Sequence, residues 1–217
     1  VSAAGELNYV EQFGFRLLEG YLDLSPDHIV SFRREYLRNV SMHNHKNKYV
    51  TDKLPHNFRF ISLIVAAFPE AKIVHVKRDP IATCWSNFKT FFSNDGLDYS
   101  NDLQDIAKYY QLYQQLMNFW KLKYPNIIYD CAYDKLTENQ AVETEKLINY
   151  LGLNWEDACL FPHKNRRTVK TASQQQIRDK IYRGSSVEWK KYKHLLDSTW
   201  LKFLEEKALK NNSRSSN

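Results

Sequence analysis

The sequence predicts an α/β fold in which helices flank a parallel sheet. Three short runs suited to strands, 48–51, 72–76 and 126–129, alternate with segments of helical periodicity. This alternation is typical of βαβ units, whose strands are parallel. The 217 residues suffice for one such domain. We expect a single domain over 1–210 and a disordered tail over 211–217.

Helices are predicted before the first strand and after each strand. Apolar residues recur along one side of 5–20. Ser25 is a natural N-cap for a second helix with Pro26 in its first position. Further helices are expected over 57–67, from Asp79-Pro80 onward, over 102–124, over 139–151 and over 197–210. Asn57 can cap the first of these, and Gly152 stops the helix that ends at 151.

Composition indicates a globular chain of the cytoplasm. Hydrophobic residues make up 43% and charged residues 26%, and no apolar run reaches the roughly 20 residues of a membrane span. The start, VSAAGELNYV, lacks the basic flank and apolar core of a signal peptide. Cys84, Cys131 and Cys159 are widely spaced and form no CxxC pair, so we expect reduced thiols, no disulfide frame and no metal site.

The net charge of +6 and the pI near 9.1 favour an anionic ligand. The basic residues are scattered, however, and this balance fits a solvated basic surface as well as a nucleic-acid partner. Nucleic-acid binding is thus supported by net charge alone, and we expect no nucleic acid and no membrane among the partners. The six glycines are also too far apart to build a glycine-rich loop.

The motif KIVHVKRDPIATCWSNF carries the main functional signal. Arg78 follows a predicted strand, and ligands of parallel sheets bind beyond the carboxyl ends of strands. Asp79 caps the next helix with Pro80 in its first position, and Ser86 lies roughly 9 Å further along the axis. The guanidinium of Arg78 and the Ser86 hydroxyl would together hold a phosphate monoester. Taken alone, the motif fits plain helix capping beside a solvated arginine better.

Two further segments carry polar and basic side chains. In YVTDKLPHNF, Lys53 stands in the same relation to its strand as Arg78 does to the next, so both cations should project from one edge of the sheet. Near the C-terminus, a polar-basic segment contains Thr171, Ser173, Arg178, Lys180 and Tyr182. Such a mixture suits a nucleotide with several phosphates, although by itself it also fits an exposed loop.

Taken together, these segments resemble the sulfotransferases that use 3′-phosphoadenosine 5′-phosphosulfate (PAPS), and especially the tyrosylprotein and bacterial tetratricopeptide-linked branches. The matching pieces cover nearly everything from Tyr49 to Tyr192: VTDKLPHNF, FPEAKIVHVKRDPIATCWSNF, YYQLYQQLMNFW, IIYDCAYDKL, INYLGLNWEDACL and VKTASQQQIRDKIYRGSSVEWKKY. The resemblance implies a P-loop-like parallel sheet flanked by helices. It also implies PAPS as donor, 3′,5′-diphosphoadenosine (PAP) as product, and no metal.

The resemblance also assigns roles to particular residues. Arg78 and Ser86 would hold the 3′-phosphate, Lys53 would stabilise charge on the leaving side, and Tyr129 would contact the nucleotide. The segment from Thr171 through Tyr182 would close over adenine and phosphate. In the family a lysine directly precedes a proline in that segment, whereas here the cation is Lys180, shifted by one position.

Sulfuryl transfer also needs a general base for the acceptor hydroxyl. Glu6 lies where tyrosylprotein sulfotransferases have Gly-Glu-Glu, but Leu7 replaces the second glutamate, which is the base in that family. His56, just after Leu54-Pro55, is the rival candidate, and a lone histidine in a turn fits a structural role equally well.

One part of the family pattern has no counterpart here. The family begins with a strand and a Gly-x-Pro-Arg-Ser-Gly-Thr-Thr loop, whose backbone N–H groups cradle the 5′-phosphosulfate. The glycine positions exclude this loop, so we expect an N-terminally truncated domain that begins after the first strand, loop and helix. An unpaired sheet edge would then invite homodimerisation, and donor binding would be weakened.

Other interpretations stay open. A P-loop kinase-like enzyme would need a Walker lysine and a carboxylate for magnesium, and neither is found in context. A non-catalytic nucleotide-binding or interaction module would use the aromatic helix around 109–120, whose rings are more often core residues. The acceptor is equally open among a peptide tyrosine, a carbohydrate hydroxyl and a small alcohol.

Overall fold

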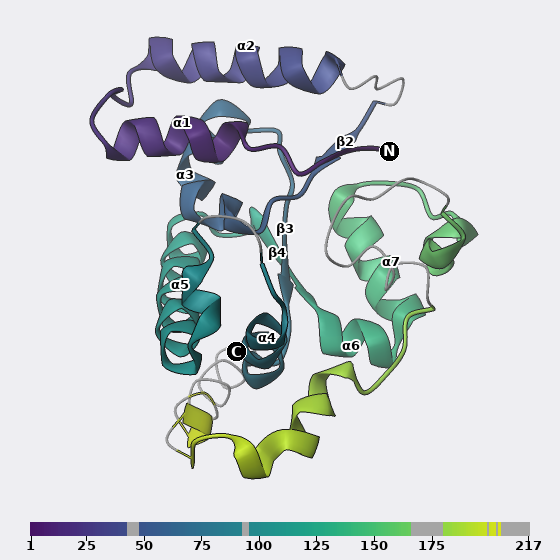
Figure 1. The fold of residues 1–217 in the computed structure, drawn as a ribbon. Coiled ribbons are helices and arrows are strands. Elements are labelled where there is room, and N and C mark those ends of the chain that lie inside the picture. Colours follow the sequence, from purple (N-terminus) through teal and green to yellow (C-terminus); the bar gives the residue numbers. More distant parts are fainter. Residues whose placement is uncertain (43–47, 93–95, 166–179, 199, 203, 205–217) are drawn as a thin grey trace. The chain divides into compact units, whose positions relative to one another are not determined.

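The computed structural model describes residues 1–42, 48–92, 96–165, 180–198, 200–202 and 204 (Figure 1). It confirms the α/β class, with short parallel strands and many helices. The chain divides into two compact units. The first consists of 1–72 and 116–124, and the second of 73–115 and everything from 125 onward.

In the first unit, strands β1 (Ser2–Gly5) and β2 (Val50–Asp52) form a parallel pair. Its helices are α1 (Tyr9–Leu18), α2 (Pro26–Met42), the 3₁₀ helix η1 (Pro55–Phe60) and α3 (Ile61–Ala67). These helices bury their apolar faces against one another. The buried residues of this core are Val10, Phe32, Phe60, Leu63, Ala67 and Phe68.

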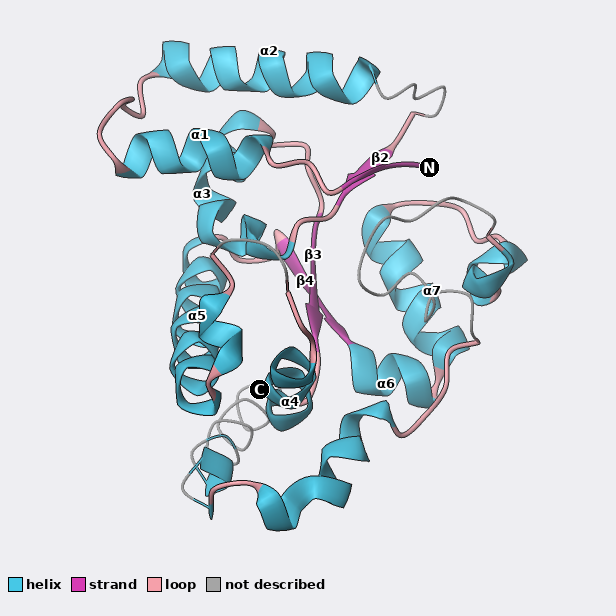
Figure 2. Ribbon diagram, viewed as in Figure 1, coloured by secondary structure: helices cyan, strands magenta, loops and turns pink. Residues whose placement is uncertain are grey.

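In the second unit, strands β3 (Ile73–Lys77) and β4 (Ile128–Ala132) pair in parallel, from Ile73 opposite Ile128 to Lys77 opposite Ala132 (Figure 2). The helices of this part are α4 (Pro80–Lys89), α5 (Leu103–Lys123, which continues into the first unit), α6 (Tyr133–Glu138) and α7 (Gln140–Leu151). The 3₁₀ helices are η2 (Asp98–Asn101), η3 (Asp157–Leu160), η4 (Pro162–Lys164) and η6 (Ser185–Leu195).

The core of the second unit joins α4 to the last helical segments. Ile81 and Cys84 of α4 pack with Ile106 of α5 and with Trp189 of η6. Trp200 belongs to the same cluster, and its indole N–H donates to the carbonyl of Leu103 at 2.7 Å. A tryptophan that is buried in this way fills much volume while its polar N–H keeps a partner.

The three predicted strands are confirmed, with their ends displaced by one to three residues, but β1 was missed. The helix expected over 5–20 starts only at Tyr9, because Ser2–Gly5 pairs with β2 instead. Ser2 pairs with Val50, which is far away in the sequence, so no local sequence pattern predicts this strand. Gly5, with φ +90°, ends it in a conformation that glycine adopts readily.

The predicted helix ends were right where a local cap exists. Pro26 begins α2, Asp102 accepts from two backbone N–H groups at the start of α5, and Gly152 ends α7 with φ +66°. The assignment of Asn57 as an N-cap was wrong: it lies inside η1, and α3 begins at Ile61. The short helix α6 was not predicted. The tail over 211–217 and most of the helix expected over 197–210 lie outside the described residues.

Two expectations about organisation stay predictions, namely the single domain over 1–210 and a homodimer through an open sheet edge. Among the described residues, each sheet has two strands. No helix in the described part of the chain combines the length and apolar character that a membrane span needs.

The packing of α1 against η1 generates a stability prediction. A Cβ added at Gly14 would lie 2.3 Å from two ring atoms of Phe60. We therefore expect Gly14→Ala to lower the free energy of unfolding by about 1–3 kcal/mol, although alanine favours helices by about 1 kcal/mol over glycine. Urea unfolding measures the change. The double variant with Phe60→Leu, which makes room for the methyl group, should recover part of the loss; a more stable Gly14→Ala protein would contradict this packing.

Candidate active site

The turn from β3 into α4 is held by two aspartates. Asp79 is the N-cap of α4 and accepts a hydrogen bond from the backbone N–H of Ala82 at 2.7 Å, with Pro80 in the first helical position. The backbone N–H of Asp79 donates to Asp134 of α6 at 3.0 Å. Burial, together with the charge of Asp134, raises the pKa of Asp79. The predicted cap is confirmed, and it fixes the backbone next to Arg78.

Arg78 lies directly beyond the carboxyl end of β3, and its guanidinium is bound within the second unit. Its Nε donates to the hydroxyl of Ser186 at 2.9 Å, and its Nη2 donates to the carbonyl of Ser185 at 2.6 Å. The guanidinium carbon also lies 5.4 Å from the centre of the Tyr133 ring, a cation–π distance. The side chain is therefore held in one orientation by neutral groups, so its positive charge is not neutralised by these contacts.

Ser86, the second predicted phosphate ligand, lies on α4 and is partly buried. Its carbonyl accepts a hydrogen bond from the Thr90 hydroxyl at 2.8 Å. Within the part of the chain that the structure describes, its own hydroxyl makes no hydrogen bond. Arg78 and Ser86 thus belong to the same strand-to-helix unit, as the motif predicted.

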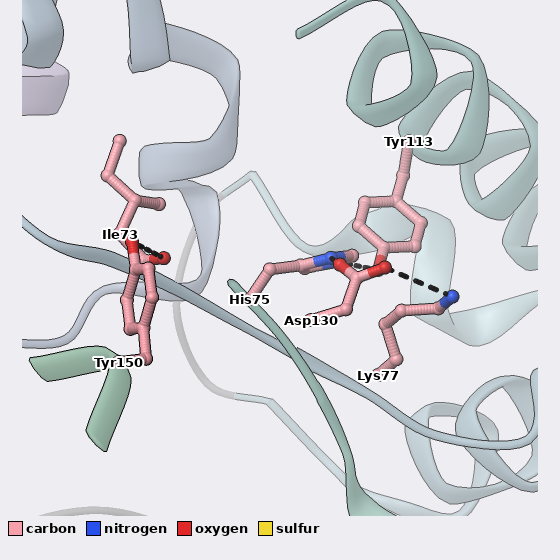
Figure 3. Close-up of polar contacts among 6 residues, drawn as sticks. All are labelled: Ile73, His75, Lys77, Tyr113, Asp130 and Tyr150. Atoms are coloured by element: carbon pink, nitrogen blue, oxygen red, sulfur yellow. Dashed lines mark hydrogen bonds and ion pairs between the residues drawn. The ribbon is translucent and has the colours of Figure 1, made fainter. Parts of the chain in front are cut away.

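A polar network that the sequence analysis missed crosses the strands just before Arg78 (Figure 3). His75 of β3 lies opposite Asp130 of β4, with its Nδ1 2.7 Å from the carboxylate. Lys77 reaches the other oxygen of Asp130 at 3.4 Å, and Nε2 of His75 is hydrogen-bonded to the Tyr113 hydroxyl of α5. Burial, and secondarily the charge of Asp130, raises the pKa of Tyr113.

This network ties together β3, β4 and α5. The polar residues inside the strand runs IVHVK and IYDCA were the available signal, since the side chain of His75 is only 11% exposed and such a side chain needs a partner. The register that brings His75 and Asp130 face to face was not readable from either run alone.

Tyr129 lies on the other face of β4 from Asp130, because side chains alternate along a strand. Its ring stacks on Tyr150 of α7 at 4.9 Å between centroids, and burial raises its pKa. The hydroxyl of Tyr150 in turn donates to the carbonyl of Ile127 and also lies 3.3 Å from the carbonyl of Ile73, the contact that Figure 3 shows. Tyr129 thus packs against α7, and its contact with a nucleotide stays a prediction.

The C-terminal nucleotide segment is described only in part. Lys180 is exposed, and so is Tyr182, at 56%. Thr171, Ser173 and Arg178 lie outside the described residues. Their roles over adenine and phosphate stay predictions.

In the first unit, Glu6 and Lys53 meet beyond the carboxyl ends of β1 and β2. The backbone N–H of Lys53 donates to the carbonyl of Gly5 at 2.9 Å, and its ammonium forms an ion pair with the Glu6 carboxylate. The Lys53 side chain is 64% exposed. This pairing was missed because β1 was not recognised. Lys53 and Arg78 belong to different units, so their convergence around one ligand stays a prediction.

His56 lies in η1 beside Glu11 and Arg59. Its Nδ1 is 3.6 Å from the Glu11 carboxylate, which also forms an ion pair with Arg59. Burial lowers the pKa of His56 below its usual 6.5, and the charge of Arg59 acts in the same direction, while Glu11 opposes both. The imidazole is therefore mainly neutral near pH 7 and able to accept a proton.

The carboxylate of Asp52, also in the first unit, has a structural role. Asp52, at the end of β2, accepts from the backbone N–H of Leu7 at 3.0 Å and from the Tyr36 hydroxyl at 2.9 Å. Burial raises the pKa of Asp52, and these hydrogen bonds act against the rise. Across the described residues, no group of three or more His, Cys, Asp or Glu side chains is arranged to hold a metal ion.

The model of a sulfotransferase family matches residues 22–157, more than half of the chain. The match includes Lys53, His56, Arg78, Ser86 and Tyr129, while Glu6 and the segment after 157 lie outside it.

Three relatives can be compared over much of this chain. An uncharacterized protein of Aquifex aeolicus is 32% identical over 192 residues, which are 88% of this chain and 25% of the relative. The omega-hydroxy-beta-dihydromenaquinone-9 sulfotransferases Stf3 of Mycobacterium bovis and Mycobacterium tuberculosis are each 29% identical over 156 residues, or 66% of this chain and 40% of theirs. The chain thus corresponds to less than half the length of these curated relatives.

The network around His75 can be tested by removing one oxygen atom. Tyr113→Phe takes away the hydroxyl that His75 contacts, so the free energy of unfolding should fall by about 1–3 kcal/mol. Tyr21→Phe is the matched control, because Tyr21 is 74% exposed and its hydroxyl can remain hydrated in both states. Urea unfolding of both variants gives the comparison. Equal stabilities would show that the network contributes nothing to the fold.

Proposed function

The chain belongs to the sulfotransferase family, and we propose that it moves a sulfuryl group from PAPS to an acceptor hydroxyl. The observation that carries the proposal is the guanidinium of Arg78, fixed beyond the carboxyl end of β3 by Ser185 and Ser186. An arginine has five N–H donors, and these two hydrogen bonds use two of them. The remaining donors and the Ser86 hydroxyl suit the 3′-phosphate of PAPS.

Lys53 would act on the leaving side of the reaction. The acceptor oxygen attacks sulfur while the bond from sulfur to the 5′-phosphate oxygen breaks, and PAP leaves with the electron pair. A cation placed near that oxygen stabilises the charge that develops on it. The Lys53–Glu6 pair is exposed, and exposed ion pairs are weak, so a phosphate can replace Glu6 as the partner of Lys53.

We assign the general base to His56 in preference to Glu6. The carboxylate of Glu6 is engaged by the ammonium of Lys53. The pKa of His56 is lowered by burial, so at neutral pH its imidazole is mainly neutral, which is the protonation state that a general base needs. In this assignment Glu6 orients Lys53, and Glu11 lies beside the imidazole.

The acceptor we propose is an alcohol, in preference to a peptide tyrosine or a carbohydrate. The name of the Stf3 relatives describes sulfation of a hydroxylated dihydromenaquinone, which is a lipid alcohol. We also propose a cytoplasmic location, which is supported by the free thiols of Cys84, Cys131 and Cys159.

The proposed donor site predicts that PAP binding depends on Arg78. Arg78→Ala should weaken PAP binding by about 10- to 100-fold, because a charged hydrogen-bond donor is worth about 1.5–3 kcal/mol. Arg78→Lys should recover part of the affinity, since it restores the charge without the planar donor pair. Isothermal titration measures the affinities, with the exposed Arg34→Ala as a control of equal charge change. If Arg78→Ala binds PAP like the unaltered protein, Arg78 is not in the donor site.

The base assignment predicts a pH dependence. Because the pKa of His56 lies below 6.5, kcat/KM should rise with pH through that lowered pKa and level off above it. His56→Gln should reduce kcat by about 10²- to 10⁴-fold and remove this acidic limb. Glu6→Gln should keep the limb and alter mainly the KM for the donor. A protein that tolerates His56→Gln but is inactive as Glu6→Gln would reverse the assignment.

A further inference from the structure

The 3₁₀ helix η6 contacts both elements that carry the proposed 3′-phosphate ligands. On one side, Ser185 and Ser186 bind the guanidinium of Arg78. On the other side, Tyr192 packs against Trp85 of α4, with 5.0 Å between ring centroids. These contacts join η6 to the residue before Ser86 as well as to Arg78.

Two more contacts fix η6 against α4. The Glu188 carboxylate lies 3.4 Å from the ammonium of Lys89. Trp189 is buried in the core next to Ile81 and Ala82. Because a buried tryptophan anchors the middle of η6, its first residues have a defined position relative to α4.

The hydrogen bonds of Arg78 also select one edge of its guanidinium. The Nε–H and the adjacent Nη2–H point along the side of the group, and Ser186 and Ser185 accept from this side. Among the described residues, no group accepts a hydrogen bond from the edge formed by Nη1 and the second N–H of Nη2, so this edge is the one we assign to a ligand. A phosphate would therefore be bound at the end of the guanidinium and not along its side.

We propose that Ser186 is a positioning residue of the donor site, which sets the orientation in which Arg78 meets the 3′-phosphate. This inference rests on the proposed function of Arg78. The carbonyl of Ser185 accepts from Nη2 alone, and with this single hydrogen bond the guanidinium plane of Arg78 could still tilt. The hydroxyl of Ser186 adds the second contact, on Nε, and two contacts on one edge fix the plane.

Tyr133 completes the arrangement from another element. Tyr133 is the first residue of α6 and directly follows β4. The centre of its ring lies 5.4 Å from the guanidinium carbon of Arg78. The Ser185 hydroxyl is 3.5 Å from the Tyr133 hydroxyl, at the limit of a hydrogen bond. Since Ser185 contacts Arg78 through its backbone, substituting its side chain should leave the guanidinium in place.

The experiment compares substitutions that differ by one hydroxyl group. Ser186→Thr and Ser186→Val have the same shape, but only threonine can accept from Nε of Arg78. We expect Ser186→Val and Ser186→Ala to weaken PAP binding about tenfold. Ser186→Thr should bind PAP within about twofold of the unaltered protein, and so should the control Ser41→Ala at an exposed serine of α2. Isothermal titration gives the affinities, and thermal unfolding shows that each variant is folded.

A double-mutant cycle separates positioning from a general structural role. If Ser186 acts through Arg78, Ser186→Val should have no further effect on PAP affinity in the Arg78→Ala background. An equal loss in both backgrounds would overturn the inference, and so would normal affinity of Ser186→Val alongside weak binding by Arg78→Ala. Normal affinity of Arg78→Ala would instead overturn the proposed donor site itself.

Discussion

The parallel pairing of β3 with β4 determines where the groups of the second unit lie. With Lys77 opposite Ala132, the next residues of both strands, Arg78 and Tyr133, emerge side by side. If one strand slipped by one residue relative to the other, the side chains of the slipped strand would turn to the opposite faces of the sheet. The His75–Asp130 contact on one face opposes such a slip, as do the hydrogen bonds of Tyr150 on the other. The position of the arginine is therefore a consequence of strand register.

The two predicted cations have different electrostatic surroundings. Arg78 is held by a hydroxyl, a carbonyl and an aromatic ring, all of which are neutral, while its charge also acts on the carboxylate of the adjacent Asp79. Lys53 is paired with the carboxylate of Glu6, which reduces the local positive potential until that partner is exchanged. The two cations therefore differ in their partners, which are neutral groups at Arg78 and a carboxylate at Lys53.

Local signals made much of the fold readable from the sequence. Ser25-Pro26, Asp79-Pro80 and Gly152 mark helix ends through their own backbone chemistry, and the structure has helix ends at these positions. Contacts between distant parts of the chain could not be read in this way. β1 is a strand only because β2 accepts it as a partner, and Asn57, despite its capping side chain, is enclosed in η1.

The candidate site shows the same division. Arg78 and Ser86 were found because they belong to one strand-to-helix motif with a regular spacing. Ser186, which holds Arg78, comes 108 positions later in the chain and looks like an ordinary loop serine in the sequence. Residues that position a functional group are generally supplied by whichever element packs nearby, so their identity follows from the tertiary fold.

The occupied flank of the arginine limits the directions from which an anion can approach. Along that flank, the Ser185 carbonyl and the Ser186 hydroxyl already accept the two N–H groups. Within the described part of the chain, the N–H groups at the outer tip of the side chain have no acceptor. Inhibitor chemistry directed at this arginine would therefore favour a compact terminal anion on a narrow stem over a broad, flat carboxylate that lies alongside the guanidinium.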